Sequence, residues 1–510
     1  MDIISDFCYH GISVYYIFTE RISVLKKWTK KELCRKLKSP DELTEMHEQI
    51  SGSVYRQTFH IQPVTGLLND PNGFIYKDGV WHLFYQWCPW GAVHGLKHWY
   101  HTTSENLINW KNLGVSIYPD TYFDNKGVYT GSAMQLGDDI YLYYTGNHRD
   151  DDWTRRSFTC MAKLTDGKLA KKYSAPLFGP CDEYTENQRD PKIVYDEETN
   201  KYYIIMGAQT KDNRGCAIIY SSSDPKFGWE YRGKLNVPGF EDFGGMWECP
   251  SLEHLGDHDI LIFCPQHLTL EGHGTGTNHC GYIIGYMDYE NLTFTPDGSF
   301  HVLDFGFDFY AAACCANVNE KNKAILTAWM GLPDASYPTD SENWSGCLTL
   351  PRELSIRHRR LIQRPIKGLE SMRENQISPG LGMLPSSAEI AVTIYPEDFQ
   401  MSLFSKKDGT GGLSINYIDK TREITIDRSN MNIRFNNENG ESRTRILDNG
   451  LTHLRIFIDH SSIEIFVNDG DAVFTSRIFP EETERYFTLS DCTSINIWEL
   501  NPTVKDDFVI

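Results

Sequence analysis

Short strand-like segments separated by turn-forming residues are the feature of this sequence that most restricts its fold. They recur from Phe59 to about Leu354, and the intervals between them are rich in Asp, Gly, Asn and Pro. Examples are the segments 73–77, 80–86, 139–144, 202–208, 216–221, 259–263 and 324–330. Many short strands with regular turns are typical of all-β sandwiches, barrels and propellers. Their recurrence over roughly 300 residues favours a propeller, but the repeat is too irregular to give a blade count.

A second strand-rich region begins near Glu389. Its hydrophobic residues alternate with period two, and turns recur about every 8–12 residues, which indicates an antiparallel β-sandwich. No acid–base constellation stands out in this region, so we expect it to pack against the rest of the chain or to contact another subunit.

These patterns divide the chain into four parts. Residues 1–55 form an N-terminal extension, in which the spacing of Trp28, Leu33 and Leu37 suggests an amphipathic helix. The propeller is predicted to occupy residues 56–355 and the sandwich residues 386–510. The basic, Pro- and Gly-containing stretch 356–385 between them is predicted to be a linker with some helix.

Length, charge and cysteine content limit the class of protein. A chain of 510 residues is too long for one core, so two domains, or a propeller with an added module, are expected. The formal charge of −20 argues against nucleic acid and anionic membranes as partners. No stretch of 18 apolar residues is present, which argues against a transmembrane span. The net charge says nothing about a small substrate, which senses only local charge, and these features leave open whether the chain is a monomer or a homo-oligomer.

The N-terminus and the cysteines both favour a cytoplasmic location. Asp2 and Asp6 stand where a signal peptide carries positive charge. The 13 cysteines are odd in number, and none forms a CxxC pair at zinc spacing. We therefore expect reduced thiols, no structural metal and no cofactor.

The run Asn69-Asp70-Pro71-Asn72-Gly73 combines the strongest turn-forming residues. It follows the apolar pair Leu67-Leu68, so a turn here would leave the Asp70 carboxylate at a strand end. An Asp-Pro-Asn-Gly run is most often an ordinary hairpin loop. A functional role for Asp70 is considered because two further acids, Asp190 and Glu248, occur in similar contexts.

Asp70, Asp190 and Glu248 share a local context in which a proline follows one or two residues later. Proline fixes the direction of the backbone and hence of a nearby side chain. Trp247 and Cys249 flank Glu248, and we expect them to desolvate its carboxyl group and raise its pKa, as a general acid requires. Arg189 precedes Asp190 and is expected to keep that carboxylate ionised. Two carboxylates across a scissile bond with a third ionised group form a glycoside-cleaving layout, although each acid taken singly also fits a structural loop.

The three acids belong to a series of motifs that follow one another from Phe59 nearly to the C-terminus. The motifs are FHIQPVTGLLNDPNGFIY (59–76), WHLFYQ (81–86), GLKHW (95–99), NLINWKNLG (106–114), GVYTGSAM (127–134), YYTGN (143–147), RDPK (189–192), GAQT (207–210), MWECP (246–250), LIFCPQ (261–266), FDFYA (307–311), AWMGLPDASYPTD (328–340), CLTLPREL (347–354) and IDHSSIEIFVNDG (458–470). This ordered series resembles glycoside hydrolase family 32, the β-fructofuranosidases, and within it the bacterial sucrose-6-phosphate hydrolases.

The resemblance implies a five-bladed β-propeller followed by a β-sandwich, with the active site at the centre of the propeller. It implies retaining hydrolysis without a metal, in which Asp70 is the nucleophile, Glu248 the acid/base and Asp190 the transition-state stabiliser. Fructose would be released from sucrose or sucrose 6-phosphate through a covalent fructosyl-enzyme. A retaining mechanism predicts that the Asp70 and Glu248 carboxyl groups lie about 5–5.5 Å apart.

The resemblance also implies a set of substrate-binding residues. They are Asn69, Gln86, Tyr129, Thr130 and Ser132 for the fructose hydroxyls, Arg189 beside Asp190, and Tyr310, Trp329 and Trp90 as aromatic faces. The aromatic residues fit an ordinary propeller core almost as well. Lys97 is a candidate partner for a phosphate, because a cation beside the pocket suits a dianion, and an ordinary surface lysine is an equally good interpretation.

The chain departs from the family pattern at three places. Ser251 stands where the family has Asp, Cys88 stands where it has Asn, and Ala312-Ala313-Cys314-Cys315 replaces its PQTF. An Asp at 251 would lie near Glu248, so its loss removes a like charge that could raise the pKa of the acid. The departures leave the pocket shape and the rate open.

Three alternatives remain on this sequence. A fructan hydrolase or fructosyltransferase would use the same carboxylates and differ in what attacks the intermediate. An arabinanase- or xylosidase-type propeller would be inverting, with its carboxyl groups about 6.5–9.5 Å apart. A non-catalytic carbohydrate-binding propeller is the third, since fold does not fix function.

Overall fold

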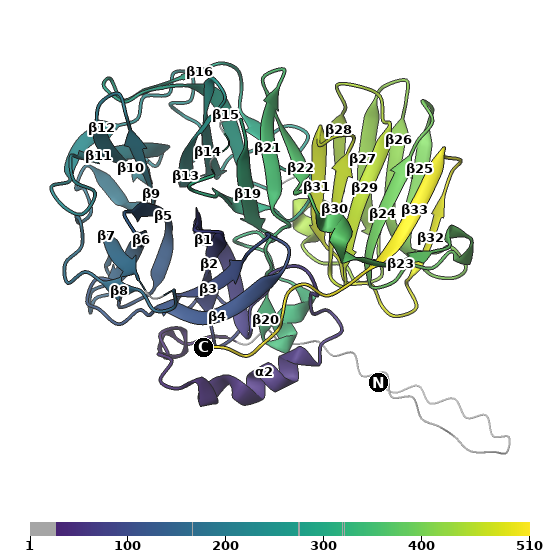
Figure 1. Ribbon diagram of the computed structural model, residues 1–510, viewed down its shortest axis with the longest axis horizontal. Helices are drawn as coiled ribbons and strands as arrows, with labels where there is room; N and C mark the ends of the chain where they lie inside the picture. The colour runs from purple at the N-terminus through teal and green to yellow at the C-terminus, as the bar shows by residue number, and fades with distance from the viewer. Residues whose placement is uncertain (1–26, 166, 274–275, 319, 321) are drawn as a thin grey trace, which may run out of the picture.

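The computed structural model describes residues 27–165, 167–273, 276–318, 320 and 322–510. The predictions made on residues 1–26 therefore lie outside the described residues. Strands dominate the described chain, and the predicted all-β class is confirmed. Ribbon views show two bodies side by side, a ring of sheets formed by the earlier part of the chain and a pair of stacked sheets formed by the later part (Figure 1).

The ring of sheets begins at Gly66 and ends at Pro365. The first sheet of the ring contains β1 (Gly66–Lys77), β2 (Val80–Cys88), β3 (His98–Ser104), β4 (Trp110–Ile117) and β20 (Trp344–Ser345). The second contains β5 (Val128–Leu136), β6 (Asp139–Arg149), β7 (Arg155–Leu164) and β8 (Lys171–Lys172). The third sheet comprises β9 (Tyr184–Asp196), β10 (Lys201–Thr210), β11 (Gly215–Ser222) and β12 (Glu230–Lys234). The fourth comprises β13 (Met246–Leu255), β14 (His258–Gln266), β15 (Gly281–Asp288), β16 (Thr293–Pro296) and β17 (His301–Val302). The last contains β18 (Tyr310–Cys314), β19 (Ala324–Trp329), β21 (Arg352–Arg357) and β22 (Arg360–Pro365).

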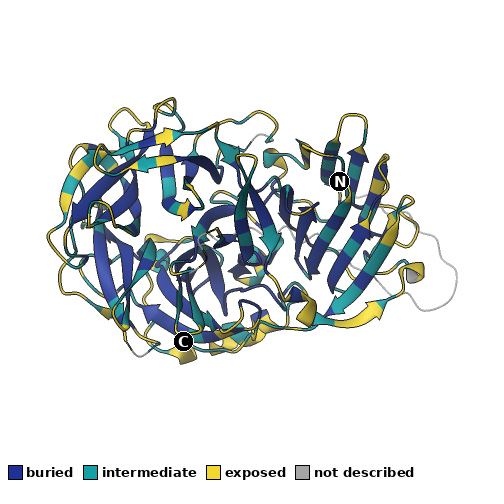
Figure 2. Ribbon diagram, turned by 45° about the horizontal axis from the view of Figure 1, so that its top comes forward, coloured by how far each residue is buried: buried dark blue, intermediate teal, exposed yellow. Residues whose placement is uncertain are grey.

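The first strand of each sheet lies toward the centre of the ring (Figure 1). β1 contacts β5, β5 contacts β9, β9 contacts β13, β13 contacts β18, and β18 contacts β1 again. The late strand β20 pairs in parallel with β1 and joins the end of the ring to its beginning. These inner strands are largely buried, while the outer loops are exposed (Figure 2). The predicted propeller is therefore seen as a closed ring of sheets in the described chain, and the number of blades stays a prediction.

The sandwich consists of two antiparallel sheets around their own core. One contains β23 (Arg373–Ile377), β24 (Ser387–Thr393), β29 (His453–Asp459), β30 (Ser462–Val467), β31 (Ala472–Arg477) and β33 (Ser494–Leu500), and the other β25 (Phe399–Ser405), β26 (Gly412–Ile418), β27 (Glu423–Asn430), β28 (Ser442–Ile446) and β32 (Tyr486–Leu489). Alternating residues such as Ile390, Ile415 and Ile456 are fully buried between them. The antiparallel β-sandwich that the period-two pattern predicts is therefore confirmed.

The predicted linker 356–385 is mostly regular structure instead. β22 completes the last propeller sheet, and β23 joins the edge of a sandwich sheet. Basic and proline residues made this stretch look like a linker, yet β22 and β23 are outer strands of their sheets, where such residues are tolerated. The prediction of a long linker is therefore wrong.

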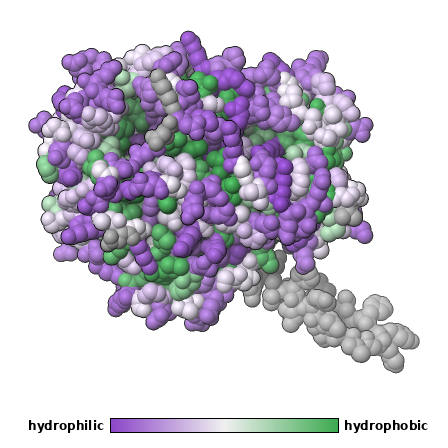
Figure 3. All heavy atoms as spheres, in the orientation of Figure 1, coloured by the Kyte–Doolittle hydropathy of each residue, from purple (hydrophilic) through white to green (hydrophobic). Residues whose placement is uncertain are grey.

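Helices are few and short in the described chain. α1 (Lys30–Leu33), η1 (Pro40–Leu43) and α2 (Thr44–Ser51) form the N-terminal segment, and η2 (Pro338–Glu342), η3 (Leu369–Met372), η4 (Pro379–Leu381) and η5 (Asn437–Asn439) lie in connections. The expected single amphipathic helix around Leu33 and Leu37 is thus broken into short pieces. None of the described helices has the length and apolarity to span a bilayer. Hydrophilic residues cover most of the face seen in Figure 3.

The C-terminal tail returns to the first propeller sheet, where it ends near β4 and α2 (Figure 1). The Trp110 amide donates a hydrogen bond of 3.0 Å to Thr503 O, and the Tyr100 hydroxyl donates one of 2.5 Å to Val509 O. Arg56 pairs with Asp506 at 2.5 Å. The tail therefore ties the end of the chain to the sheet that carries Asp70.

Candidate active site

Bulges in the central strands place the three predicted acids. The pairing of β1 with β2 skips Asn69 and Asp70, that of β10 with β9 skips Asp190, and that of β13 with β14 skips the two residues after Glu248. A bulge bends its strand and re-aims a side chain. The Asn69–Gly73 run therefore lies inside β1, and the prediction that it forms a turn at a strand end is wrong.

Two residues at these bulges have left-handed backbone conformations that non-glycine residues rarely adopt. Asp190 has φ of 67° and Cys249 has φ of 49°. Such strain persists only where the surrounding structure enforces it, and it is concentrated at functional sites. The Cys249 amide donates a hydrogen bond of 2.9 Å to Asp190 Oδ2, so the two strained residues stabilise each other.

The bulges direct the predicted acids into one cavity at the centre of the propeller. It has a volume of about 200 Å³ and is lined by Asn69, Asp70, Gln86, His94, Lys97, Tyr129, Thr130, Arg189, Asp190, Glu248, Tyr310, Trp329 and Pro333. Acids from three different sheets, separated by as much as 178 residues of sequence (248 − 70), thus meet in one place. Most of the predicted substrate-binding residues lie around them.

Asp70 is held by three neutral polar side chains. Asn69 Nδ2 donates a hydrogen bond of 3.0 Å to Oδ1, Gln86 Nε2 donates one of 3.2 Å to Oδ2, and the Thr130 hydroxyl donates to Oδ2 as well. Burial raises the pKa of Asp70, and the charge of Glu248 raises it further, whereas Thr130 and Lys97 lower it. The carboxylate is fixed in position but retains high free energy, as a nucleophile requires.

Lys97 is not a surface lysine, because only 1% of it is exposed. Its ammonium group donates to Asn69 Oδ1, and Asn69 in turn donates to Asp70. Burial lowers the pKa of Lys97 to about 8. The lysine therefore acts on Asp70 through Asn69 and through its charge. Its ammonium group, held beside Asn69, is not positioned to bind a distant phosphate.

Glu248 is hydrogen-bonded on both oxygens. Arg189 donates to Oε1 through Nε at 3.0 Å and through Nη2 at 2.6 Å. Gln266 Nε2 and the Tyr310 hydroxyl each donate to Oε2 at 2.6 Å. The glutamate thus has two distinct sides, one facing a cation and one facing neutral donors.

The arrangement around Asp190 differs from the prediction that Arg189 would serve it. The closest approach of Arg189 to Asp190 is 3.9 Å, whereas the guanidinium contacts Glu248 directly. Burial and the charges of Glu248 and Asp70 raise the pKa of Asp190, although Arg189 and the Cys249 amide oppose the rise. Successive side chains of a strand point to opposite sides, so Arg189, although next to Asp190 in sequence, contacts Glu248 of the neighbouring sheet instead.

The aromatic predictions divide into two groups. Tyr129, Tyr310 and Trp329 line the cavity, and His94 meets Trp329 edge-on with ring centroids 6.0 Å apart. Trp90 is absent from the described cavity lining, because Arg35 of the N-terminal segment stacks 3.4 Å from its ring and accepts its indole N–H at Arg35 O. The structure therefore gives Trp90 a packing role in place of sugar stacking.

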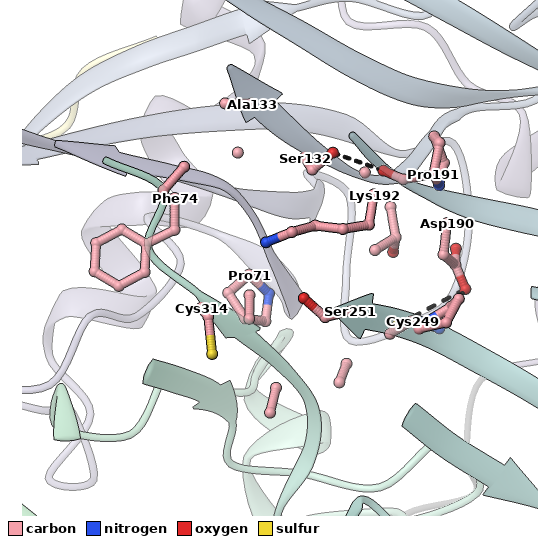
Figure 4. A pocket seen from close by; sticks show the side chains of 18 residues that line it. Pro71, Phe74, Ser132, Ala133, Asp190, Pro191, Lys192, Cys249, Ser251 and Cys314 are labelled. Atoms are coloured by element: carbon pink, nitrogen blue, oxygen red, sulfur yellow. Dashed lines mark hydrogen bonds between the residues drawn. The ribbon is translucent and has the colours of Figure 1, made fainter. Parts of the chain in front are cut away.

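Ser132 also differs from its predicted role as a sugar ligand. Its hydroxyl donates a hydrogen bond of 2.7 Å to Pro191 O and accepts one of 3.0 Å from the Ile193 amide (Figure 4). Both partners belong to β9, so Ser132 ties β5 to the strand that carries Asp190. It acts as a support for the site.

Two of the three departures from the family pattern lie around a smaller cavity of about 40 Å³, which shares Thr130 and Asp190 with the first. Figure 4 shows Ser251 and Cys314 at this cavity. Cys314 lines it, as do Ala312 and Ala313. The Ser251 hydroxyl donates a hydrogen bond of 2.6 Å to Glu253, and Lys192 pairs with the same carboxylate at 2.5 Å. Ser251 therefore holds the carboxylate of Glu253, which also pairs with Lys192.

Cys88, the remaining departure, is buried beneath the loop that carries His94 and Lys97. A Cβ on Gly95 would lie 3.0 Å from its sulfur, so this loop packs directly on the thiol. Burial raises the pKa of Cys88 and keeps it protonated. The cysteine thus supports the cavity wall without lining it.

Three residues of the site were not predicted from the sequence. His94 and Pro333 line the cavity, and Gln266 holds Glu248. Gln266 and Pro333 fall within quoted motifs, which is the signal that could have found them; His94 directly precedes one. No group of three or more His, Cys, Asp or Glu side chains in the described chain is arranged to hold a metal ion.

Comparison with known proteins identifies the family. Residues 60–365 match the glycosyl hydrolases family 32 N-terminal domain, and residues 370–501 match the family 32 C-terminal domain. The chain belongs to glycoside hydrolase family 32. It is therefore a glycoside hydrolase, with the propeller and sandwich of that family.

Relatives within family 32 match nearly the whole chain. A sucrose-6-phosphate hydrolase of Staphylococcus xylosus is 40% identical, covering 90% of this chain and 94% of its own, and one of Bacillus subtilis is 37% identical, covering 90% and 97%. The solved structure of sucrose-6-phosphate hydrolase from Lactobacillus gasseri has a TM-score of 0.87 at 34% identity, covering 94% of this chain and all of the other. A Bombyx mori β-fructofuranosidase variant in complex with sucrose has a TM-score of 0.78 at 29% identity, covering 92% and 100%.

Proposed function

We propose that this protein is a retaining β-fructofuranosidase that hydrolyses sucrose, sucrose 6-phosphate or both. The observation that carries the proposal is the convergence of Asp70, Asp190 and Glu248 in one cavity, with a different environment for each carboxylate. The names of the relatives and the sucrose-bound neighbour support the choice of substrate.

In the first step, an Asp70 oxygen attacks the anomeric C2 of the fructosyl unit while the bond from C2 to the glucosyl oxygen breaks. Glu248 gives its proton to that leaving oxygen. The products of this step are glucose, or its 6-phosphate, and a fructosyl ester of Asp70. Gln266 and Tyr310 hold one oxygen of Glu248 and Arg189 holds the other, so the carboxyl group is fixed in position for proton transfer.

In the second step, water attacks C2 and breaks the ester, and Glu248 accepts the proton of that water. Asp190 holds fructose hydroxyls, and its bonds strengthen as oxocarbenium charge develops. Asn69, Gln86 and Thr130 keep the Asp70 carboxylate aligned in both steps. We expect the two catalytic carboxyl groups to lie about 5–5.5 Å apart, as retention demands.

We further propose a cytoplasmic location, which the free thiols of the described cysteines support.

The test is release of fructose from sucrose and, side by side, from sucrose 6-phosphate, with Asp70→Ala as the blank. The proposal expects turnover of at least one sugar well above the blank. Fructan chains and acceptor sugars are assayed in parallel, because preferential cleavage of fructans or transfer to sugars would assign the same site to a fructan hydrolase or fructosyltransferase. Absence of turnover above the blank for every sugar would overturn the proposal.

A further inference from the structure

The loop between β2 and β3, residues 89–97, supplies two residues of the active-site cavity, His94 and Lys97. Its last residue is tied to β5, because the Val128 amide donates a hydrogen bond of 3.0 Å to Lys97 O. The middle of the loop has the sequence WGAVHG (90–95), which contains two glycines. Glycine leaves the backbone more freedom than any other residue, so this loop needs support from outside to hold His94 in one place.

Residues 28–35 of the N-terminal segment cover the middle of this loop. The Trp28 ring lies directly against Gly91, where an added Cβ would be 2.5 Å from a ring atom. The carbonyl oxygen of Leu33 would lie 3.0 Å from a Cβ on Gly95. The two glycines of the loop are therefore the places where the N-terminal segment approaches most closely, and a side chain at either place would push the two apart.

A third contact joins Arg35 to Trp90. Arg35 O accepts the indole N–H of Trp90 at 2.9 Å, and the guanidinium lies 3.4 Å from the centre of the ring. Glu42 pairs with the guanidinium at 3.1 Å and also accepts the amides of Lys38 and Ser39 at 3.0 and 3.1 Å. Arg35 is therefore held from behind while it packs on the loop.

The N-terminal segment has attachments of its own to the rest of the protein. Leu43 and Ile50 are buried, with 0% and 1% of their surface exposed. His47 donates a hydrogen bond of 2.8 Å to Val64 O, and its ring stacks on Phe508 at 4.8 Å. The family 32 match begins at residue 60, so this anchored segment lies outside both matched domains. It can act as a fixed support for the loop.

We propose that residues 28–35 are a positioning element of the active site, which holds the loop 89–97 so that His94 and Lys97 line the cavity. The inference rests on the proposed function, because it concerns the reaction carried out in that cavity. It gives the N-terminal segment a role in catalysis, with Trp28 and Arg35 as positioning residues.

The loop reaches the reacting groups on two sides of the cavity. Lys97 donates to Asn69, which donates in turn to the Asp70 carboxylate. His94 meets Trp329 edge-on in the cavity wall. A displacement of about 1 Å in a supporting element can lower a rate about 100-fold, so loosening the loop is expected to impair turnover without unfolding the protein.

The first test compares Trp28→Ala and Arg35→Met with the unmodified full-length enzyme. Each variant is expected to lower kcat/KM for sucrose, or for sucrose 6-phosphate if that is the sugar cleaved, about ten-fold or more. Lys36→Met, at an exposed position next to Arg35, is the matched control and leaves kcat/KM unchanged. Thermal melting checks that each variant is folded, and folded variants with unchanged kcat/KM would overturn the positioning role.

Gly91→Ala tests the same contact from the side of the loop. Gly91 has an ordinary backbone conformation, and the nearest atoms to an added methyl group all belong to Trp28. We expect about a ten-fold loss of kcat/KM in Gly91→Ala, but little further loss when it is added to Trp28→Ala, which has room for the methyl group. Gly52→Ala is the control, because its Cβ would meet Gln49 O at an ordinary 3.5 Å. Losses that simply add would overturn the contact.

Hydrogen exchange measured by mass spectrometry separates the positioning role from the reaction. Peptides covering residues 89–97 are expected to exchange faster in Trp28→Ala and Arg35→Met, while peptides of β29 in the sandwich exchange as in the unmodified enzyme. Unchanged exchange of the loop would overturn the inference whether or not sugar is cleaved. Absence of turnover in the unmodified enzyme would overturn the proposed function, whereas unchanged kcat/KM in the variants of an active enzyme overturns only the positioning role.

Discussion

Two groups of buried charged residues, each with three carboxylates and two cations, differ in the partners that surround their carboxylates. The first is in the cavity, where Asp70, Asp190 and Glu248 face Lys97 and Arg189. The second lies between propeller and sandwich, where Asp304, Asp459 and Glu464 face His60 and Arg352. The numbers of acids and cations are the same, but the cavity carboxylates line an open space.

Hydrogen bonds account for much of the difference. Asp459 accepts the backbone amides of residues 58, 59 and 60 as well as His60 Nδ1, and Glu464 accepts the Leu350 amide and Arg352. Burial alone would raise the pKa of both carboxyl groups. His460 and His60 lower the pKa of Asp459 instead, and Arg352, His60 and the Leu350 amide lower that of Glu464. Asp304 is the exception, since burial still raises its pKa despite Arg352.

The comparison shows how one kind of residue serves two purposes. Carboxylates paired on every side act as a fixed joint between domains. Asp70 and Asp190, whose partners do not offset their burial, keep a raised pKa, as is common at functional sites. The predictions below change one group at a time.

The largest effect is expected from Asp70→Asn. The variant loses the nucleophile while Gln86 and Thr130 remain, so kcat falls by about 10⁴-fold or more. Steady-state fructose release measures the loss, and thermal melting shows that the fold persists. An active variant would remove Asp70 from the reaction.

Arg352→Met is expected to destabilise the protein by about 3–5 kcal/mol, because it leaves Asp304 and Glu464 buried without their cation. Urea unfolding measures the change. Arg434→Met is the control. The Arg434 side chain is 49% exposed in its pair with Glu441, so its loss is expected to cost less than about 1 kcal/mol. Equal losses of unfolding free energy in the two variants would contradict the claim that the buried ion pairs of Arg352 contribute more to stability than the pair of Arg434.

His60 is expected to make stability fall at alkaline pH. Burial alone would lower its pKa, but Asp459 and Glu464 raise it to about 9, above the value of about 6.5 in the unfolded chain. Its contribution, on the order of 3 kcal/mol, is complete below about pH 6.5 and is lost as the pH rises through about 9. Urea unfolding across this range compares the unmodified protein with His60→Gln, and parallel profiles would contradict the assignment.

Asp190→Asn is expected to stabilise the protein while impairing catalysis. The raised pKa of Asp190 means that its ionised form costs folding free energy, and this cost grows as the pH rises above about 4. Removing the charge gains roughly 2 kcal/mol at neutral pH. A melting temperature that rises together with a large loss of kcat is the expected pair of results, and a lower melting temperature would contradict it.

The smallest effect is expected from Ser251→Ala. Its hydroxyl supports Glu253, but Lys192 already neutralises that carboxylate. We expect less than ten-fold loss of kcat/KM and about 1 kcal/mol or less of stability. A much larger loss would mean that Ser251 replaces the family Asp in function.

The sequence allowed the fold class, the family and the set of converging acids to be predicted, because motifs and strand patterns are local. Pairings across sheets were not predictable. Arg189 is next to Asp190 in sequence but bonds Glu248, and Trp90 is covered by Arg35 from a segment 55 residues earlier. A bulged strand such as β1 uses the same residues as a turn, so the Asn69–Gly73 run was misread for a physical reason.

The most direct test of the account is to trap the fructosyl-enzyme. Glu248→Gln is incubated with fructosyl fluoride, whose leaving group needs no proton, and the protein is examined by intact mass and peptide mapping. We predict an adduct of one fructosyl residue on the peptide that contains Asp70, because the second step lacks its base. An adduct on another acid, or fluoride release with inversion and no adduct, would contradict the central claim that the Asp70 carboxylate is the nucleophile.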